Sequence, residues 1–243
     1  MNVLSTAVAA VLDAQVASGK PLAIIVAGHN GSGKSTMWYR HLAPALQAPL
    51  INADRMMLSI LPEADTKGRL PGWAQTLRDT DRAWMAVARE SVDSFVVNAM
   101  KAGVPFAYET VFSHWQVKAD GTVESKIDRI HQLQAAGYYV LLFFVGLTNV
   151  NLSIGRVLTR HAKGGHTVPQ DRLLTRFPKT QKAVSAALLV ADASILVDNS
   201  TDESKAFTVA RVQEGESLLF DIRSADSPPS RITEWLSKVA PFD

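Results

Sequence analysis

The feature that most constrains this chain of 243 residues is the loop after its first apolar run, Leu22 to Ala27. Positions 28–36 have the sequence G-H-N-G-S-G-K-S-T, which fits the pattern G-x-x-x-x-G-K-[ST]. Backbone N–H groups of such a loop wrap nucleotide phosphates, and the pattern is most specific when a strand precedes it and a helix follows. Both conditions are met here, because the residues from Lys34 to Leu42 can form a helix. The sequence therefore predicts a site for ATP with Mg²⁺ rather than a flexible glycine turn.

Most of the residues predicted to bind the nucleotide belong to this segment. Lys34 is expected to bind the β and γ phosphates, and the hydroxyl of Ser35 is expected to bind Mg²⁺. Within this segment the predicted set is Gly28, Asn30, Gly31, Ser32, Gly33, Lys34, Ser35 and Thr36, and Arg176 from a later segment is predicted to bind the nucleotide as well.

Composition excludes several other classes of function. The 25 Lys and Arg residues nearly balance the 23 Asp and Glu residues, so net charge gives no support for nucleic-acid binding. The absence of cysteine excludes disulfides, thiolate metal sites and cysteine nucleophiles. The N-terminal segment lacks the basic start and continuous apolar core of a signal peptide, and the longest apolar run, Tyr138 to Leu147, is about half a membrane span. We expect a cytoplasmic protein that binds neither nucleic acid nor a membrane.

Apolar runs alternate along the chain with segments of helical periodicity. This alternation is typical of βαβ units and predicts an α/β fold: a P-loop NTPase kinase-like, doubly wound, mainly parallel sheet with a helical lid and a C-terminal hairpin. Strands are predicted at Leu22–Ala27, Pro49–Ala53, Val104–Tyr108, Tyr138–Gly146 and Ser194–Val197, with the hairpin at Phe207–Gln213 and Ser217–Ile222. Helices are predicted at Val3–Ser18, Lys34–Leu42, Trp73–Lys101, Val123–Ala136, Val150–His161, Gln170–Val190 and Arg231–Val239. We expect one domain over 1–243, with a helical insertion at 72–102 and a basic lid at 156–182.

Acidic residues follow three of the predicted strands: Asp54, Glu109 and Asp198. In a doubly wound sheet, ligands gather at the carboxyl ends of the strands. Asp54 is the candidate base that accepts the proton of an attacking hydroxyl, although an aspartate there could also cap a helix. Glu109 could bind substrate, hold a metal-bound water or pair with an arginine, and we expect substrate contact. Thr110 and Ser113 place further hydroxyls nearby.

The predicted lid carries seven cations and one acid. Arg156 and Arg160 are four residues apart, so on a helix they project from one face. With Gly164 and Gly165 as a hinge, the segment could bring guanidinium groups onto a triphosphate, and the competing interpretation is a solvated basic helix face. The cations are Arg156, Arg160, Lys163, Arg172, Arg176, Lys179 and Lys182.

Together, these motifs make the chain similar to the zeta-toxin family of P-loop kinases. The similarity rests on positions 27–36, I-N-A-D at 51–54, Y-E-T at 108–110, A-G-Y at 136–138, R-V-L-T-R-H-A-K-G-G-H-T-V-P at 156–169, R-F at 176–177 and D-N-S at 198–200. The resemblance implies transfer of the ATP γ-phosphate to a hydroxyl of a UDP-activated amino sugar such as UDP-N-acetylglucosamine. It also implies a possible small helical antitoxin that obstructs nucleotide entry.

The resemblance assigns roles to single residues. Lys34 would bind phosphates, Ser35 would hold Mg²⁺ and Asp54 would be the base, with Glu109 and Thr110 contacting substrate. Family members clamp phosphates with lid arginines, and the matching candidates here are Arg156, Arg160 and Arg176. This chain departs from the best-known toxins by carrying Gly-Gly-His before Thr167, so that His166 or Arg176 would supply the second clamp.

Two alternative functions remain open at this stage. One is a P-loop kinase for another hydroxyl, such as that of an antibiotic, a nucleoside or a dinucleotide. The other is a non-kinase ATP-binding switch or ATPase, against which the sequence has neither a Leu-Ser-Gly-Gly-Gln signature nor an apolar strand ending in adjacent Asp-Glu.

Overall fold

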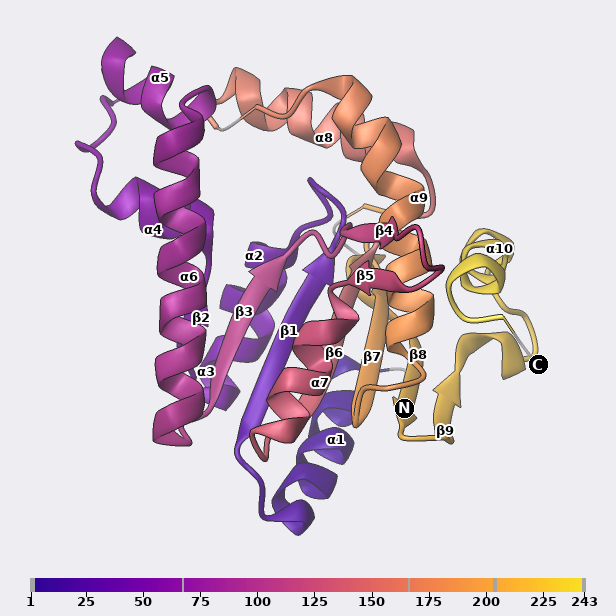
Figure 1. Ribbon diagram of the computed structural model, residues 1–243. Coiled ribbons are helices and arrows are strands. Elements are labelled where there is room, and N and C mark those ends of the chain that lie inside the picture. Colours follow the sequence, from indigo (N-terminus) through magenta and orange to yellow (C-terminus); the bar gives the residue numbers. More distant parts are fainter. Residues whose placement is uncertain (1–2, 67, 166, 203–204, 242–243) are drawn as a thin grey trace.

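A computed structural model describes residues 3–66, 68–165, 167–202 and 205–241. At its centre is a seven-stranded sheet with strand order β2-β3-β1-β6-β7-β8-β9, covered by helices on both faces (Figure 1). The parallel strands are β1 (Leu22–Gly28), β2 (Leu50–Ile51), β3 (Phe106–Thr110), β6 (Tyr139–Gly146) and β7 (Ala193–Asp198). The antiparallel strands at one edge are β8 (Thr208–Glu214) and β9 (Ser217–Asp221). The predicted doubly wound fold with its C-terminal hairpin is confirmed.

The helices alternate with these strands. In chain order they are α1 (Leu4–Ser18), α2 (Lys34–Met37), a π-helical turn (Trp38–Leu42), α3 (Ala43–Leu46), α4 (Ala53–Ser59), α5 (Gly72–Asp79), α6 (Arg82–Ala102), α7 (Ile127–Ala135), α8 (Val150–Ala162), α9 (Gln170–Ala187), a 3₁₀ turn (Ile222–Ser224) and α10 (Ser230–Val239). Among the described helices, none combines the length and the apolar character needed to cross a bilayer.

Side chains of β1 alternate between two buried layers, as a strand covered on both faces requires. Ile25 belongs to the layer formed with α6, α7, α9 and α10. Ile24 and Val26 belong to the opposite layer, formed with α1 and with Trp38 of the π-helical turn. The sheet is thus buried on both faces, so polar ligands can reach it at the ends of its strands.

Two helix predictions are wrong in part. The helix predicted over Trp73–Lys101 is two helices, because Asp81 accepts a hydrogen bond from the N–H of Trp84 at 2.9 Å and so caps a new helix. The helix predicted over Val123–Ala136 begins only at Ile127. Its first residues form β5 (Val123–Ser125), which pairs with β4 (Trp115–Val117) as a separate antiparallel ribbon.

Helices α8 and α9 arch over the carboxyl ends of the central strands and meet the α5 region on the other side (Figure 1). One contact joins the two sides. The guanidinium Nη1 of Arg78, at the end of α5, donates to the carbonyl of Gly164, in the turn after α8, at 2.9 Å. Arg78 is buried, and its Nε and Nη2 also donate to the carboxylate of Asp79. The lid therefore rests on the helical insertion.

Candidate active site

The loop at 28–36, here called the phosphate loop, connects β1 to α2. Gly31 and Gly33 have φ angles of +71° and +93°, which residues with a side chain rarely adopt. A Cβ atom at Gly33 would lie 2.7 Å from the side-chain nitrogen Nδ2 of Asn199, so a larger residue would also clash with Asn199. Lys34 is buried, and its Nζ donates to the carbonyls of Gly28 and His29 at 3.1 Å each. The lysine is thus held inside the curve of the loop.

Two side chains from other elements hold the loop in shape. Nδ2 of Asn199, directly after β7, donates to the carbonyl of Ser32 at 2.8 Å. The Ser153 hydroxyl of α8 donates to the carbonyl of Asn30 at 2.7 Å. These two bonds engage the carbonyls of Ser32 and Asn30 and so fix the path of the loop backbone.

Glu109, at the end of β3, lies beside both predicted nucleotide ligands of α2. Its Oε2 accepts hydrogen bonds from Ser35 Oγ at 2.9 Å and from Asn52 Nδ2 at 2.8 Å. Its Oε1 lies 3.8 Å from Nζ of Lys34. The structure places the carboxylate of Glu109 against the hydroxyl predicted to bind Mg²⁺, and the predicted substrate contact of Glu109 stays a prediction.

This oxygen pair suits Mg²⁺ chemically. In the described part of the chain, no three His, Asp or Glu side chains gather into a metal site. Mg²⁺ bound with nucleotides commonly uses one or two protein oxygens together with phosphate oxygens and water. Ser35 and Glu109 match that pattern, whereas a site for a tightly caged metal is not seen among the described residues.

The electrostatic surroundings of Lys34 show which other groups lie near it. Burial is the main influence and lowers the pKa of Lys34, whereas the charges of Glu109 and Asp54 raise it and Arg160 lowers it further. Asp54 from α4 and Arg160 from α8 therefore act on the same ammonium group from separate elements.

Asp54 lies exposed in the first turn of α4. The cap of this helix is Asn52, whose side-chain oxygen accepts a hydrogen bond from the N–H of Arg55 at 3.0 Å. The alternative prediction, that Asp54 is the helix cap, is therefore wrong. Its carboxylate is left available at the carboxyl end of β2.

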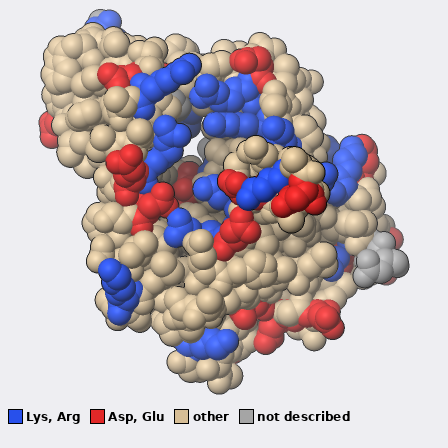
Figure 2. All heavy atoms as spheres, viewed as in Figure 1, with Lys and Arg blue, Asp and Glu red and all other residues tan. Residues whose placement is uncertain are grey.

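The lid places cations opposite Asp54. Arg156 and Arg160 line a cavity of about 380 Å³ with Thr159, Lys163 and Gly165. A Cβ atom at Gly31 would lie 3.1 Å from Cβ of Arg156, so this arginine begins directly beside the phosphate loop. Lysine and arginine side chains gather around the opening between the lid and the body (Figure 2).

Arg176 of α9 is half-buried and lies within the electrostatic reach of Asp54. Burial lowers its pKa most, Arg172 and Arg89 lower it further, and Asp54 raises it. Arg89 belongs to α6, on the insertion side of the cleft. Cations from both walls, and one carboxylate, thus act on this guanidinium.

Other predicted residues have different surroundings. The hydroxyl of Thr110 accepts the N–H of Phe112 at 3.2 Å, which supports the turn after β3, and Ser113 lies half-buried in that loop. Thr36 is exposed on α2. His166 lies outside the described residues.

Sequence reasoning missed three residues that support this site. Asn52 and Asn199 stand within the quoted motifs at 51–54 and 198–200, and an amide directly after a buried strand was the available signal. Ser153 gave no local signal, because only the packing of α8 on the phosphate loop reveals its role.

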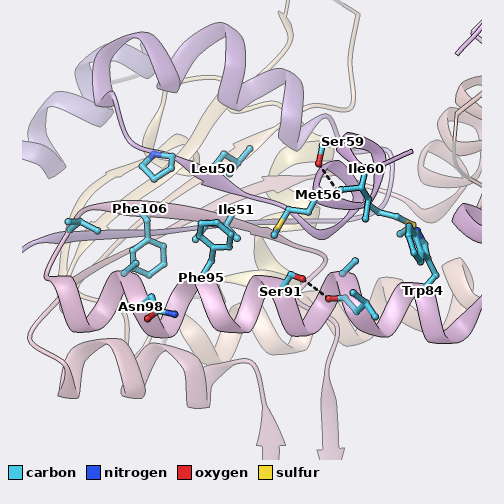
Figure 3. A pocket seen from close by; sticks show the side chains of 16 residues that line it. Leu50, Ile51, Met56, Ser59, Ile60, Trp84, Ser91, Phe95, Asn98 and Phe106 are labelled. Atoms are coloured by element: carbon cyan, nitrogen blue, oxygen red, sulfur yellow. Dashed lines mark hydrogen bonds between the residues drawn. The ribbon is translucent and has the colours of Figure 1, made fainter. Parts of the chain in front are cut away.

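A second cavity, larger than the one beside Arg156 and Arg160, lies elsewhere. It measures about 670 Å³ and lies between α4, α6 and β2, where Figure 3 shows mainly apolar side chains such as Met56, Phe95 and Phe106. None of its lining residues is charged or belongs to the phosphate loop. Phosphoryl chemistry needs compensating charge, so we place the candidate active site at the phosphate loop and not in this cavity.

Known proteins share this fold. The chain resembles a solved structure from the PezAT chromosomal toxin-antitoxin system of Streptococcus pneumoniae, with a TM-score of 0.54 and 15% identity over 90% of this chain and 78% of that one. It also resembles the AvrRxo1-ORF1:-ORF2 structure with ATP, with a TM-score of 0.58 and 15% identity over 82% of this chain and 60% of that one. At these identities the likeness concerns the fold.

Sequence comparison is more specific. An uncharacterized protein of Haemophilus influenzae is 26% identical over 155 residues, which cover 64% of this chain and 91% of that protein. The family model described as Zeta toxin matches residues 8–216, well over half of the chain. This chain belongs to the zeta toxin family.

Proposed function

We propose that this protein transfers the γ-phosphate of ATP to a hydroxyl of a UDP-activated amino sugar such as UDP-N-acetylglucosamine. Family membership supports a kinase-type phosphotransferase. The observation that carries the proposal is the convergence on Lys34, where Glu109 lies 3.8 Å from Nζ and Asp54 and Arg160 act on the same charge. A phosphate-binding lysine, a carboxylate beside the metal, an exposed aspartate and a further cation are the groups that phosphoryl transfer to an alcohol requires.

In this proposal, ATP supplies the phosphoryl group, and Mg²⁺ would supply positive charge beside its phosphates. Lys34 binds the β and γ phosphates, and Ser35 with Glu109 holds the metal or its water. Asp54 accepts the proton of the acceptor hydroxyl while the hydroxyl oxygen of the acceptor forms a bond to the γ phosphorus. The bond from that phosphorus to the β,γ-bridging oxygen breaks, and ADP leaves. Arg156, Arg160 and Arg176 neutralise the charge that spreads over the transferred group.

The acceptor is proposed to carry its own negative charge. Arg89 on α6 and Arg172 on α9 act on Arg176 from the two walls of the cleft. Three guanidinium groups near one carboxylate suit a substrate with a diphosphate, because repulsion among the cations falls when an anion enters. A UDP-sugar meets this condition, and an uncharged alcohol does not.

The family also suggests a protein partner and a cellular location for this enzyme. The PezAT structure comes from a toxin-antitoxin system, and we propose a small helical antitoxin that covers the nucleotide entrance of this chain. We also propose a cytoplasmic enzyme made of one kinase domain over 1–243, with the insertion at 72–102 and the lid at 156–182.

The test is incubation with γ-labelled ATP, Mg²⁺ and separate acceptors: UDP-N-acetylglucosamine, UDP-glucose, uridine and an aminoglycoside. The proposal predicts label on UDP-N-acetylglucosamine, seen as a mass increase of one phosphate. Label only on uridine or the aminoglycoside would contradict the proposed acceptor. Label only as free phosphate, whatever the acceptor, would make the protein an ATPase.

A further inference from the structure

His29 is a residue of the phosphate loop, and its side chain contacts the lid. Its carbonyl accepts hydrogen bonds from Nζ of Lys34 and from the N–H of Ser32, each at 3.1 Å. Its imidazole stacks on the ring of Phe177 in α9, with ring centroids 3.9 Å apart and an angle of 13° between the planes. The main chain of one residue thus holds the catalytic lysine, while its side chain holds the lid helix.

The ring of His29 acts here as an apolar surface. His29 is 2% exposed, and neither ring nitrogen has a hydrogen-bond partner among the described residues. The ring of Phe144 in β6 also contacts the His29 ring, edge to face, with ring centroids 5.6 Å apart. Burial, helped by the positive charge of Lys34, lowers the pKa of His29 to about 3, so the ring is neutral at physiological pH. The neutral His29 ring therefore interacts with its surroundings through aromatic contacts.

The stack of His29 on Phe177 lies one residue along the chain from Arg176, a proposed phosphate ligand. Phe177 is buried and directly follows Arg176, whose guanidinium senses Asp54 across the cleft. The position of Arg176 relative to Lys34 therefore depends on where Phe177 packs. Phe177 packs on the ring of His29, and the carbonyl of His29 accepts a hydrogen bond from Lys34.

We propose that His29 is a positioning residue: its stack on Phe177 fixes α9 against the phosphate loop, so that Arg176 and Lys34 act together on the transferred phosphate. The catalytic part of this inference rests on the proposed phosphotransferase function. The mechanical part, the fixing of α9 by His29, does not.

Loss of the ring should affect turnover more than nucleotide binding. The loop backbone that holds Lys34 is retained in a variant with another side chain at position 29. We expect His29→Ala to lower kcat about 10-fold with little change in KM for ATP, since aromatic pairs contribute modest energies. We expect His29→Phe to have the kcat of the parent. Phenylalanine keeps an aromatic ring, and neither ring nitrogen of His29 has a hydrogen-bond partner among the described residues that the change would remove. His131→Ala, at an exposed histidine of α7, is the matched control and should behave like the parent.

Two measurements test the inference. The first is a double-mutant cycle with Arg176→Ala: if His29 acts through Arg176, the double variant should be no slower than Arg176→Ala alone. Effects that multiply, or a His29→Phe variant as slow as His29→Ala, would overturn the positioning role.

The second measurement is amide hydrogen exchange of α9, which needs no activity. Exchange over the first half of α9 should rise in His29→Ala and return to the parent value in His29→Phe. Unchanged exchange in His29→Ala would overturn the mechanical part. If the parent enzyme phosphorylates no acceptor, the proposed function fails, and this measurement still decides whether His29 holds the lid.

Discussion

Nδ2 of Asn52 donates a 2.8 Å hydrogen bond to Oε2 of Glu109, the same carboxylate oxygen that accepts the Ser35 hydroxyl. Because Asn52 also caps α4 through its oxygen, one amide ties the helix that carries Asp54 to the carboxylate beside the phosphate loop. The proposed base and the proposed metal site therefore share a support.

Glu109→Gln keeps the shape of the side chain and removes its charge. We predict an apparent Mg²⁺ affinity about 10- to 100-fold weaker, as is typical for groups that orient a metal ligand. The measurement is a Mg²⁺ titration of phosphoryl transfer at saturating ATP. Glu124→Gln, on the exposed strand β5, is the control. An unchanged Mg²⁺ titration for Glu109→Gln would exclude a role at the metal.

Lys34→Met removes the ammonium group but keeps much of the length of the chain. We predict a loss in kcat/KM of about 10³-fold, because the charge compensates a transition state in a partly dry site. Steady-state kinetics with ATP provides the measurement, and Lys118→Met, at an exposed lysine directly after β4, is the control. A loss of less than threefold would mean that the phosphates bind elsewhere.

Acidification should destabilise the protein partly through His29. Its folded pKa is about 3 against 6.5 in the unfolded chain, so between these values the unfolded state binds more protons and stability falls as pH falls. Between pH 7.5 and pH 5 this contribution amounts to about 2 kcal/mol. His29→Phe lacks it, so its unfolding free energy should fall about 2 kcal/mol less over that interval in urea titrations. Equal pH slopes for parent and variant would show that His29 is protonated in the folded protein.

The contact between lid and insertion gives a fourth prediction. Arg78→Gln removes hydrogen bonds from a buried guanidinium to the carbonyl of Gly164 and to Asp79, and bonds to charged groups each contribute about 1.5–3 kcal/mol. We predict a lower melting temperature and a higher KM for ATP. Arg82→Gln, exposed in the first turn of α6, is the control. A normal KM with a lowered melting temperature would mean that the contact serves stability alone.

The local sequence pattern was enough to predict elements whose residues all favour the same structure. The strand, glycine loop and helix around Lys34 obey both apolar periodicity and loop chemistry, and the carboxyl-end rule identified Asp54 and Glu109 before any geometry was known. The break at Thr80 was missed because helical periodicity continues across it, and only the capping contact of Asp81 with Trp84 shows the new start.

Contacts between distant elements could not be predicted in this way. Ser153 and Asn30 are 123 residues apart, and Arg78 and Gly164 are 86 apart. The partner of Glu109 was also beyond local reasoning, because the orientation of a carboxylate at a strand end depends on the amide of Asn52 from the neighbouring strand's end.

The central claim is that the phosphate loop holds ATP while Asp54 accepts the proton of an acceptor hydroxyl. The most direct measurement compares the parent with Asp54→Asn in transfer of labelled γ-phosphate to UDP-N-acetylglucosamine, with ATP affinity determined in parallel. We predict a loss in kcat of about 10²- to 10⁴-fold for Asp54→Asn, with ATP affinity within threefold of the parent. Transfer by Asp54→Asn at the parent rate would contradict the account.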